Sequence, residues 1–191
     1  MVEENQVPTV RRVSRITGKT IVLRDVLPSD ADFIFSVRTD PKKSAYISSV
    51  SGDVADQVRW IEQYRTGEGQ AYFIIENKEG HALGTVRLYA ARGNSFCWGS
   101  WILANGAPPS ASIESALIVY RFALDTLGFT GAYFQVSREN TSVWAFHERF
   151  GARRAGETNV EFEYTIDQAE IRQSFARYKK FVSAELDVQE Y

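Results

Sequence analysis

The sequence predicts a mixed α/β fold of the α+β type, with a mainly antiparallel central sheet and helices on both faces. Between residues 71 and 103, three β-rich segments follow one another over short links, which is typical of antiparallel neighbours. A long helical segment and a further strand come next, and such a strand–helix–strand crossover brings a parallel pair into the same sheet. The order of segments therefore predicts a mixed sheet covered by helices on two sides.

The length and composition are those of a single domain with a substantial core. The 191 residues are 44% hydrophobic and 13% aromatic, which suits one buried core better than two domains. The formal net charge is -2 and the basic residues occur as isolated pairs, so no nucleic-acid partner is expected. One cysteine and two histidines exclude an internal disulfide and a cysteine-based metal site, and no bound metal is expected.

No targeting signal is evident. The first residues lack the charged start and apolar run of a signal peptide, and no segment approaches the ~18 apolar residues of a membrane span. We therefore expect a cytoplasmic protein that does not act at a membrane.

The first third of the chain predicts an arm, one strand and two helices. Residues 1–19 lack periodicity and are expected to form an N-terminal arm that precedes a single domain over residues 20–182. The β-branched segment 20–24 predicts a strand. A Pro-Ser-Asp signal opens a helix over residues 28–41, and residues 53–67 predict a second helix with an aspartate cap and a glycine stop.

The middle of the chain predicts three strands and the longest helix. The strands are expected at residues 71–75, 82–89 and 95–103, with a hairpin turn between the first two. An irregular segment with two adjacent prolines leads into a helix over residues 112–127. One face of that helix carries an apolar stripe formed by Ile113, Ala116, Leu117, Tyr120, Leu124 and Leu127.

The last third predicts two strands and two helices. A buried strand is expected at residues 132–136, a short helix at 141–149 and a strand at 160–166. Asp167 has the form of a helix cap and opens a terminal helix. Residues 183–191 are expected to form a C-terminal tail.

The segment from Trp98 to Leu127 is the first candidate for chemistry. A loop that leads into a long helix exposes backbone N–H groups at the positive end of the helix dipole. Such a helix start suits a phosphate or pyrophosphate. The alternative is structural, with Ser112 capping the helix and the adjacent prolines stiffening a surface turn.

The second candidate is the segment from Ser137 to Ala152, in which a strand runs into a polar turn and a short aromatic helix. This segment resembles the C-terminal signature of GNAT acetyltransferases. Asn140 matches the asparagine of that signature, Glu148-Arg149 its Glu-Lys pair and Gly151 its glycine. The order of segments over residues 20–166 also resembles the GNAT order.

The resemblance implies acetyl-CoA as cosubstrate and no metal. In GNAT enzymes the pantetheine arm pairs with the strand before the loop, here the edge from Gly99 to Leu103, and the pyrophosphate lies against residues 107–113. A backbone N–H near Ile102 or Leu103 would polarise the thioester carbonyl. The cofactor-binding residues implied by the resemblance are Ile102, Leu103, Ser110, Ala111, Ser112, Ile113 and Asn140.

The loop departs from the family pattern. The usual phosphate loop has Arg or Gln, two residues, Gly, one residue, and Gly or Ala, whereas residues 107–114 contain no glycine. Two adjacent prolines remove two N–H donors, and Glu114 is expected to bring negative charge close to the phosphates. Backbone donors from Ser110 to Ile113 remain.

His147 is the predicted catalytic residue. It occupies the position of the tyrosine that protonates the departing thiolate in many GNAT enzymes. An imidazole titrates near neutrality and can donate a proton there, so we predict that His147 is the general acid. The alternative is a helix histidine that is solvated or packed against Trp144 or Phe150.

Three further residues are candidates for substrate binding. Glu161 and Glu163 alternate with aromatic residues on the last strand, where they could hold an ammonium group or act through water as a base. A solvated sheet face is the alternative. Trp98 and Trp101 have an odd spacing that predicts opposite faces, and Trp101 either walls the acceptor pocket or packs in the core.

The fold alone does not choose the amine that accepts the acetyl group. An overall likeness to acetyltransferases of bacterial surface-sugar pathways favours a small-molecule amine, a 4-amino sugar nucleotide, that attacks acetyl-CoA directly in a ternary complex. The alternatives are acetylation of protein N-termini or ribosomal proteins, and a degenerate domain that binds a ligand without turnover. The resemblance is also compatible with a homodimer.

Overall fold

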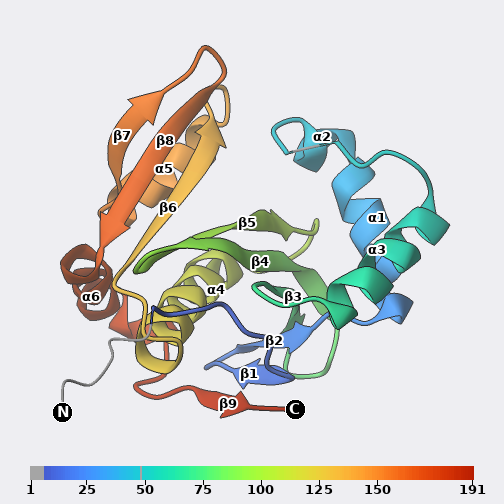
Figure 1. Ribbon diagram of the computed structural model, residues 1–191, viewed down its shortest axis with the longest axis horizontal. Helices are drawn as coiled ribbons and strands as arrows, with labels where there is room; N and C mark the ends of the chain where they lie inside the picture. Colours follow the sequence, from blue (N-terminus) through green and yellow to red (C-terminus); the bar gives the residue numbers. More distant parts are fainter. Residues whose placement is uncertain (1–6, 48) are drawn as a thin grey trace.

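The computed structural model describes residues 7–47 and 49–191, whose strands form one nine-stranded sheet in the order β7-β8-β6-β5-β4-β3-β2-β1-β9 (Figure 1). The strands are β1 (Arg15–Thr17), β2 (Ile21–Asp25), β3 (Ala71–Asn77), β4 (Ala82–Arg92), β5 (Ser95–Leu103), β6 (Gly131–Ser137), β7 (Arg153–Glu157), β8 (Glu161–Asp167) and β9 (Asp187–Gln189). The α-helices are α1 (Ala31–Thr39), α2 (Pro41–Ser44), α3 (Val54–Thr66), α4 (Pro109–Arg121), α5 (Thr141–Phe150) and α6 (Gln168–Arg177). All neighbouring strands run antiparallel except β5 and β6, which run parallel. The predicted mixed, mainly antiparallel sheet is therefore confirmed.

Helices cover both faces of the sheet, as predicted. The larger core joins one face to α4 and α6 and includes Phe73, Leu117 and Ile171. A smaller core joins the opposite face to α1 and α3 and includes Tyr72 and Ile61. Adjacent residues of β3 enter different cores because successive side chains of a strand point to opposite faces.

Short-range signals fix the helix ends where the sequence predicts them. The Asp53 carboxylate accepts from the Asp56 N–H at 3.0 Å, and the Asp56 carboxylate accepts from the Asp53 N–H at 2.9 Å, which forms a capping box at the start of α3. Gly151 ends α5 with a φ of 104°, a conformation that glycine adopts without strain. Asp167 caps α6 by accepting from the Ala169 N–H at 2.9 Å.

The structure differs from the expected arm and tail. Residues 15–17 form β1, which pairs with β2 on one side and with β9 from the C-terminal end on the other. Val10 and Val13 are buried ahead of β1. Three-residue strands are too short to produce a clear alternating pattern, which explains why the sequence did not predict them. Residues 1–6 of the expected arm lie outside the described residues.

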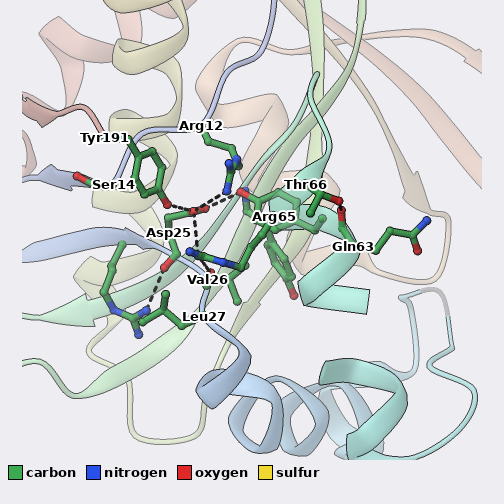
Figure 2. A network of polar contacts seen from close by, with 12 residues as sticks. Arg12, Ser14, Asp25, Val26, Leu27, Gln63, Arg65, Thr66 and Tyr191 are labelled. Atoms are coloured by element: carbon green, nitrogen blue, oxygen red, sulfur yellow. Dashed lines mark hydrogen bonds and ion pairs between the residues drawn. The ribbon is translucent and has the colours of Figure 1, made fainter. Parts of the chain in front are cut away.

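A buried carboxylate ties these terminal segments to the domain (Figure 2). Asp25 is 2% exposed and accepts hydrogen bonds from the Tyr64 hydroxyl at 2.5 Å and from the Tyr191 hydroxyl. The guanidinium groups of Arg12 and Arg65 lie 3.6 and 3.8 Å from the same carboxylate. The Asp25 contacts therefore join β2, α3 and both ends of the described chain.

Three elements differ in detail from the prediction. The edge strand β7 and the short helix α2 were not expected, because neither carries an apolar periodicity. The longest helix begins at Pro109, three residues before the predicted start, and ends in a π-turn over Phe122–Thr126. Within the described part of the chain, each helix is too short or too polar to cross a bilayer.

Candidate functional site

The parallel strands β5 and β6 separate along their length and open a cleft. They pair only from Ser95 opposite Gly131 to Cys97 opposite Tyr133, although both strands continue further. The cleft has a volume of about 820 Å³. It is lined by residues of β4, β5, β6, β8, α4 and α5 and, from across β5, by residues of α1, α2 and α3. The edge of β5 that faces β6 therefore offers backbone groups to a ligand.

The cleft has walls on both faces of the sheet. Along β4, Val86 and Leu88 enter the larger core beneath α4. Arg87 points to the opposite face, where its guanidinium lies 5.1 Å from the ring of Trp60 on α3. Because β5 and β6 diverge, one cleft connects the side of α4 with the side of α1 and α3.

A β-bulge interrupts β5 at the cleft. Ser100 and Trp101 together lie opposite the single residue Val86 of β4, between the pairs Thr85–Ile102 and Arg87–Gly99. Ser100 has a φ of 47°, in the left-handed region that a serine rarely adopts. Such a bulge leaves backbone groups of the inserted residue outside the regular ladder.

The bulge also overturns the expectation that Trp98 and Trp101 point to opposite faces. Their ring centroids lie 5.3 Å apart, because the inserted residue inverts the alternation of side chains. The Trp101 indole donates to the Ser115 hydroxyl of α4 at 3.1 Å. Trp101 thus lines the cleft and packs on the larger core at the same time.

His147 lies in an aromatic cluster at the divergence of the strands. Its ring centroid is 4.1 Å from that of Phe134, 5.2 Å from Trp98 and 5.8 Å from Phe146. The side chain is 5% exposed, and its Nδ1 has no hydrogen-bond partner among the described residues. Burial lowers the pKa of His147 to about 3, so the imidazole is neutral at physiological pH. This low pKa differs from the predicted titration of His147 near neutrality.

The prolines before α4 take helix-start positions that tolerate them. Pro108 is the N-cap and Pro109 the first helical residue, where an N–H would have no partner within the helix. The Ala111 N–H donates to the Pro108 carbonyl at 2.9 Å, and the Ser112 hydroxyl donates to the Pro109 carbonyl at 2.8 Å. The helix start therefore forms without the glycines of the usual loop.

Glu114 does not point toward the cleft, which corrects the expectation of negative charge there. The side chain is 1% exposed, and its carboxylate accepts from the backbone N–H groups of Thr20 at 2.7 Å and Ile21 at 3.3 Å. The Thr20 hydroxyl donates to it as well. Glu114 thus fixes α4 to the turn between β1 and β2.

The cleft brings together seven of the predicted site residues. These are Trp101, Ile102, Leu103, Ser112, Asn140, His147 and Glu161. Four predicted residues do not line it, namely Ser110, Ala111, Ile113 and Glu163. Glu161 and Glu163 share a face of β8, but Glu163 lies farther along, beside Gly156 of β7.

Other lining residues were not predicted as a group. They are the basic and aromatic side chains Arg38, Lys42, Lys43, Tyr46, Trp60, Arg87 and Tyr89, which come from the α1–α3 region and from β4. No local pattern joins residues so far apart in the sequence. No three His, Cys, Asp or Glu side chains gather to suit a metal ion in residues 7–47 and 49–191.

Known proteins share this architecture. Residues 20–153 match the acetyltransferase (GNAT) domain family. The chain is similar to the structure of apo FdhC, a nucleotide-linked sugar GNAT, with a TM-score of 0.79 and 36% identity over 88% of this chain and 98% of that chain. No curated protein sequence matches the chain.

Two more distant structures share the fold. A GCN5-related N-acetyltransferase from Brucella melitensis has a TM-score of 0.76 and 15% identity over 93% of this chain and 89% of that chain. A spermidine N-acetyltransferase from Vibrio cholerae, solved with CoA and spermine, has a TM-score of 0.71 and 15% identity over 80% of this chain and 98% of that chain. With a family match over more than half of its length and the similarity to FdhC, the chain belongs to the GNAT acetyltransferase family.

Proposed function

We propose that the protein is an acetyl-CoA-dependent N-acetyltransferase whose acceptor is the primary amine of a nucleotide-linked amino sugar. The observation that carries this proposal is the cleft between β5 and β6, with the bulge at Ser100–Trp101 on its wall. An acyl transferase needs a donor for the developing oxyanion beside a channel for the thioester. The diverging strands would supply both features in one cleft.

Acetyl-CoA supplies the activated acetyl group as a thioester. The free edge of β5 from Gly99 to Leu103 would pair with the amides of the pantetheine arm, and Ser112 and the start of α4 would hold the pyrophosphate. Asn140, at the start of α5, lines the cleft on the opposite side. The inward-turned Glu114 removes the repulsion that the sequence suggested.

We assign the oxyanion donor to a backbone N–H of the bulge rather than to the regular part of β5. Ile102 and Leu103 are in register with Thr85 and Gly84 of β4. The bulge at Ser100–Trp101 redirects the backbone beside the divergence of β5 and β6, so one of its N–H groups is our candidate donor.

Two side chains are suited to the movement of protons. Glu161, the carboxylate in the cleft lining, would accept the amine proton directly or through water. His147 would donate an N–H hydrogen bond to the departing sulfur, whose negative charge favours the protonated ring. The C–N bond forms as the C–S bond breaks, the amine proton passes to Glu161, and coenzyme A leaves as a thiolate that takes a proton from solvent.

The acceptor class follows from the charge of the cleft. Four of its lining residues are cationic (Arg38, Lys42, Lys43 and Arg87), whereas Glu161 is its one carboxylate among the described residues. Such a surface favours an anionic acceptor and opposes a polyamine. FdhC, at 36% identity, is named a nucleotide-linked sugar GNAT, which supports the same class.

The test is calorimetric titration with acetyl-CoA, followed by thiol release with acetyl-CoA and a panel of amines. We expect micromolar binding and turnover with 4-amino sugar nucleotides. Turnover with peptides alone would favour a protein N-terminal acetyltransferase. Binding without turnover of any amine would identify a degenerate domain, and the absence of binding would overturn the cofactor assignment.

A further inference from the structure

Arg87 is held rigidly on the floor of the cleft. Its guanidinium lies 5.1 Å from the ring centroid of Trp60 and 4.7 Å from that of Tyr89. Its Nε donates to the Gln70 side-chain oxygen at 2.9 Å, and its Nη2 donates to the same oxygen. Two aromatic rings and one neutral amide therefore orient this cation before any ligand arrives.

Among residues 7–47 and 49–191, no carboxylate forms an ion pair with Arg87. The groups that act on it electrostatically are Tyr89, Tyr72, Arg38 and Tyr64, none of which is a carboxylate. Burial lowers the pKa of Arg87, which reflects the cost of keeping this cation partly out of water. A partly buried charge without a counter-ion is unfavourable unless a ligand compensates it.

Arg24 provides a comparison within the same sheet. It is also half-buried, but its guanidinium pairs with Asp30 at 2.8 Å and with Glu76 at 2.7 Å. Two carboxylates thus compensate the charge of Arg24. The difference at Arg87 points to a negative partner outside the protein.

Neighbouring cations extend this positive region along the cleft. Lys42 and Lys43 belong to α2 and line the same cleft, and neither forms an ion pair among the described residues. The two lysines lie on α2, and Arg87 lies on the floor of the cleft beneath α1. An elongated anion can therefore contact more than one of these cations.

This region is separate from the start of α4. Arg87 and Tyr89 face the side of the sheet that carries α1 and α3, whereas Val86 and Leu88 face α4. A phosphate at Arg87 and a pyrophosphate at the start of α4 would therefore lie on opposite faces of the sheet, within the one cleft that both Arg87 and Ser112 line, so the two regions can serve two ligands.

We infer that Arg87, together with Lys42 and Lys43, forms an anion subsite that binds the diphosphate of a nucleotide-linked acceptor. The inference rests on the proposed function for the choice of acceptor. A guanidinium binds phosphate oxygens through two parallel hydrogen bonds, and the lysines add charge as the diphosphate extends toward α2. Tyr89 and Trp60 offer aromatic faces beside it.

The test is calorimetric titration of the full chain with uridine diphosphate and thymidine diphosphate, with pyrophosphate as a second probe. We expect nucleoside diphosphate binding that weakens at least tenfold in Arg87→Gln and in the Lys42→Gln/Lys43→Gln double variant. Acetyl-CoA affinity should stay within about twofold of wild type. Arg59→Gln is the matched control, because it removes the same charge from the exposed face of α3 and should leave nucleotide binding unchanged.

Several outcomes would overturn the inference. The first is the absence of nucleoside diphosphate binding, and the second is unchanged nucleotide affinity in both cleft variants. The third is a parallel loss of acetyl-CoA affinity, which would assign Arg87 to the binding of acetyl-CoA. Pyrophosphate binding as tight as nucleotide binding would show that the site binds free phosphate compounds and does not recognise a nucleotide-linked acceptor. If Arg87→Gln does not fold, the lysine variant decides. Loss of nucleotide binding in these variants without turnover of any amine would retain the subsite and reject the proposed function.

Discussion

The hydroxyl of Thr85 donates a hydrogen bond of 2.6 Å to the backbone carbonyl of Ser100. Thr85 is fully buried on β4, and Ser100 is the bulged residue with a φ of 47°. A side chain of one strand therefore holds an unusual backbone conformation in the next. This contact connects β4 to the bulge of β5, to which we assign the oxyanion donor.

We expect Thr85→Val to lower kcat about tenfold while the KM for acetyl-CoA changes little. Valine keeps the shape of threonine but leaves the Ser100 carbonyl without its donor, a loss of about 1–3 kcal/mol that relaxes the bulge. Thr85→Ser retains the hydroxyl and should recover most of the rate. Steady-state kinetics of the three proteins check this, and equal kcat values would show that Thr85 does not position the bulge.

Glu161 and Glu163 form a matched pair on one face of β8, of which only Glu161 lines the cleft. We expect Glu161→Gln to reduce kcat by at least tenfold, because an amide cannot accept the amine proton. Glu163→Gln removes the same charge two residues away and should retain most of the turnover. Thiol-release assays from pH 6 to 9 compare the two, and equal effects would exclude Glu161 as the base.

The sequence predicted the central elements because each carried a local signal. The meander strands are β-rich segments joined by short links, Asp53 and Asp167 cap helices, and the glycine at 151 closes α5. The segments β1, β7 and β9 lacked such a signal, because β1 and β9 have three residues each and β7 is a polar edge strand that pairs with β8. Local periodicity cannot reveal strands that are so short or so polar.

The residues of the candidate site show the same difference between those that a local sequence signal marks and those that it does not. Trp101, Ile102, Asn140 and His147 were found because a motif and a strand boundary mark them in the sequence. The cationic residues of the cleft were not predicted as a group, because they come from separate elements across the sheet. The bulge at Ser100 was missed as well, since a single inserted residue leaves no compositional trace, and it reversed the side on which Trp101 was expected.

Asp25 is expected to be a major contributor to stability. Its buried carboxylate accepts from Tyr64 and Tyr191, and two arginines lie within 4 Å, so its removal leaves several buried polar groups uncompensated. Asp25→Ala should lower the free energy of unfolding by about 3–5 kcal/mol. Tyr191→Phe removes one donor and should cost about 1 kcal/mol. Urea unfolding measures both, and a loss below 1 kcal/mol for Asp25→Ala would contradict this role.

His147 should make the folded protein sensitive to acid. Its pKa is about 3 in the fold against 6.5 for the free side chain, so below pH 6.5 the unfolded chain binds a proton that the folded chain does not. Unfolding stability should therefore fall as pH drops from 6.5 toward 3, by about 1.4 kcal/mol per unit once the unfolded histidine is charged. At pH 5 this contribution amounts to about 2 kcal/mol.

The measurement is the free energy of unfolding in urea at pH 7 and pH 5 for the wild type and two variants. His147→Phe keeps an aromatic ring beside Phe134 and should lose about 2 kcal/mol less than the wild type between the two pH values. His81→Gln changes the exposed histidine on the turn between β3 and β4 and should keep the wild-type difference. The comparison between variants removes the effect of carboxylates that titrate in the same range. An equal pH dependence in all three proteins would mean that His147 is hydrated and free to titrate, which would restore the imidazolium as a candidate general acid.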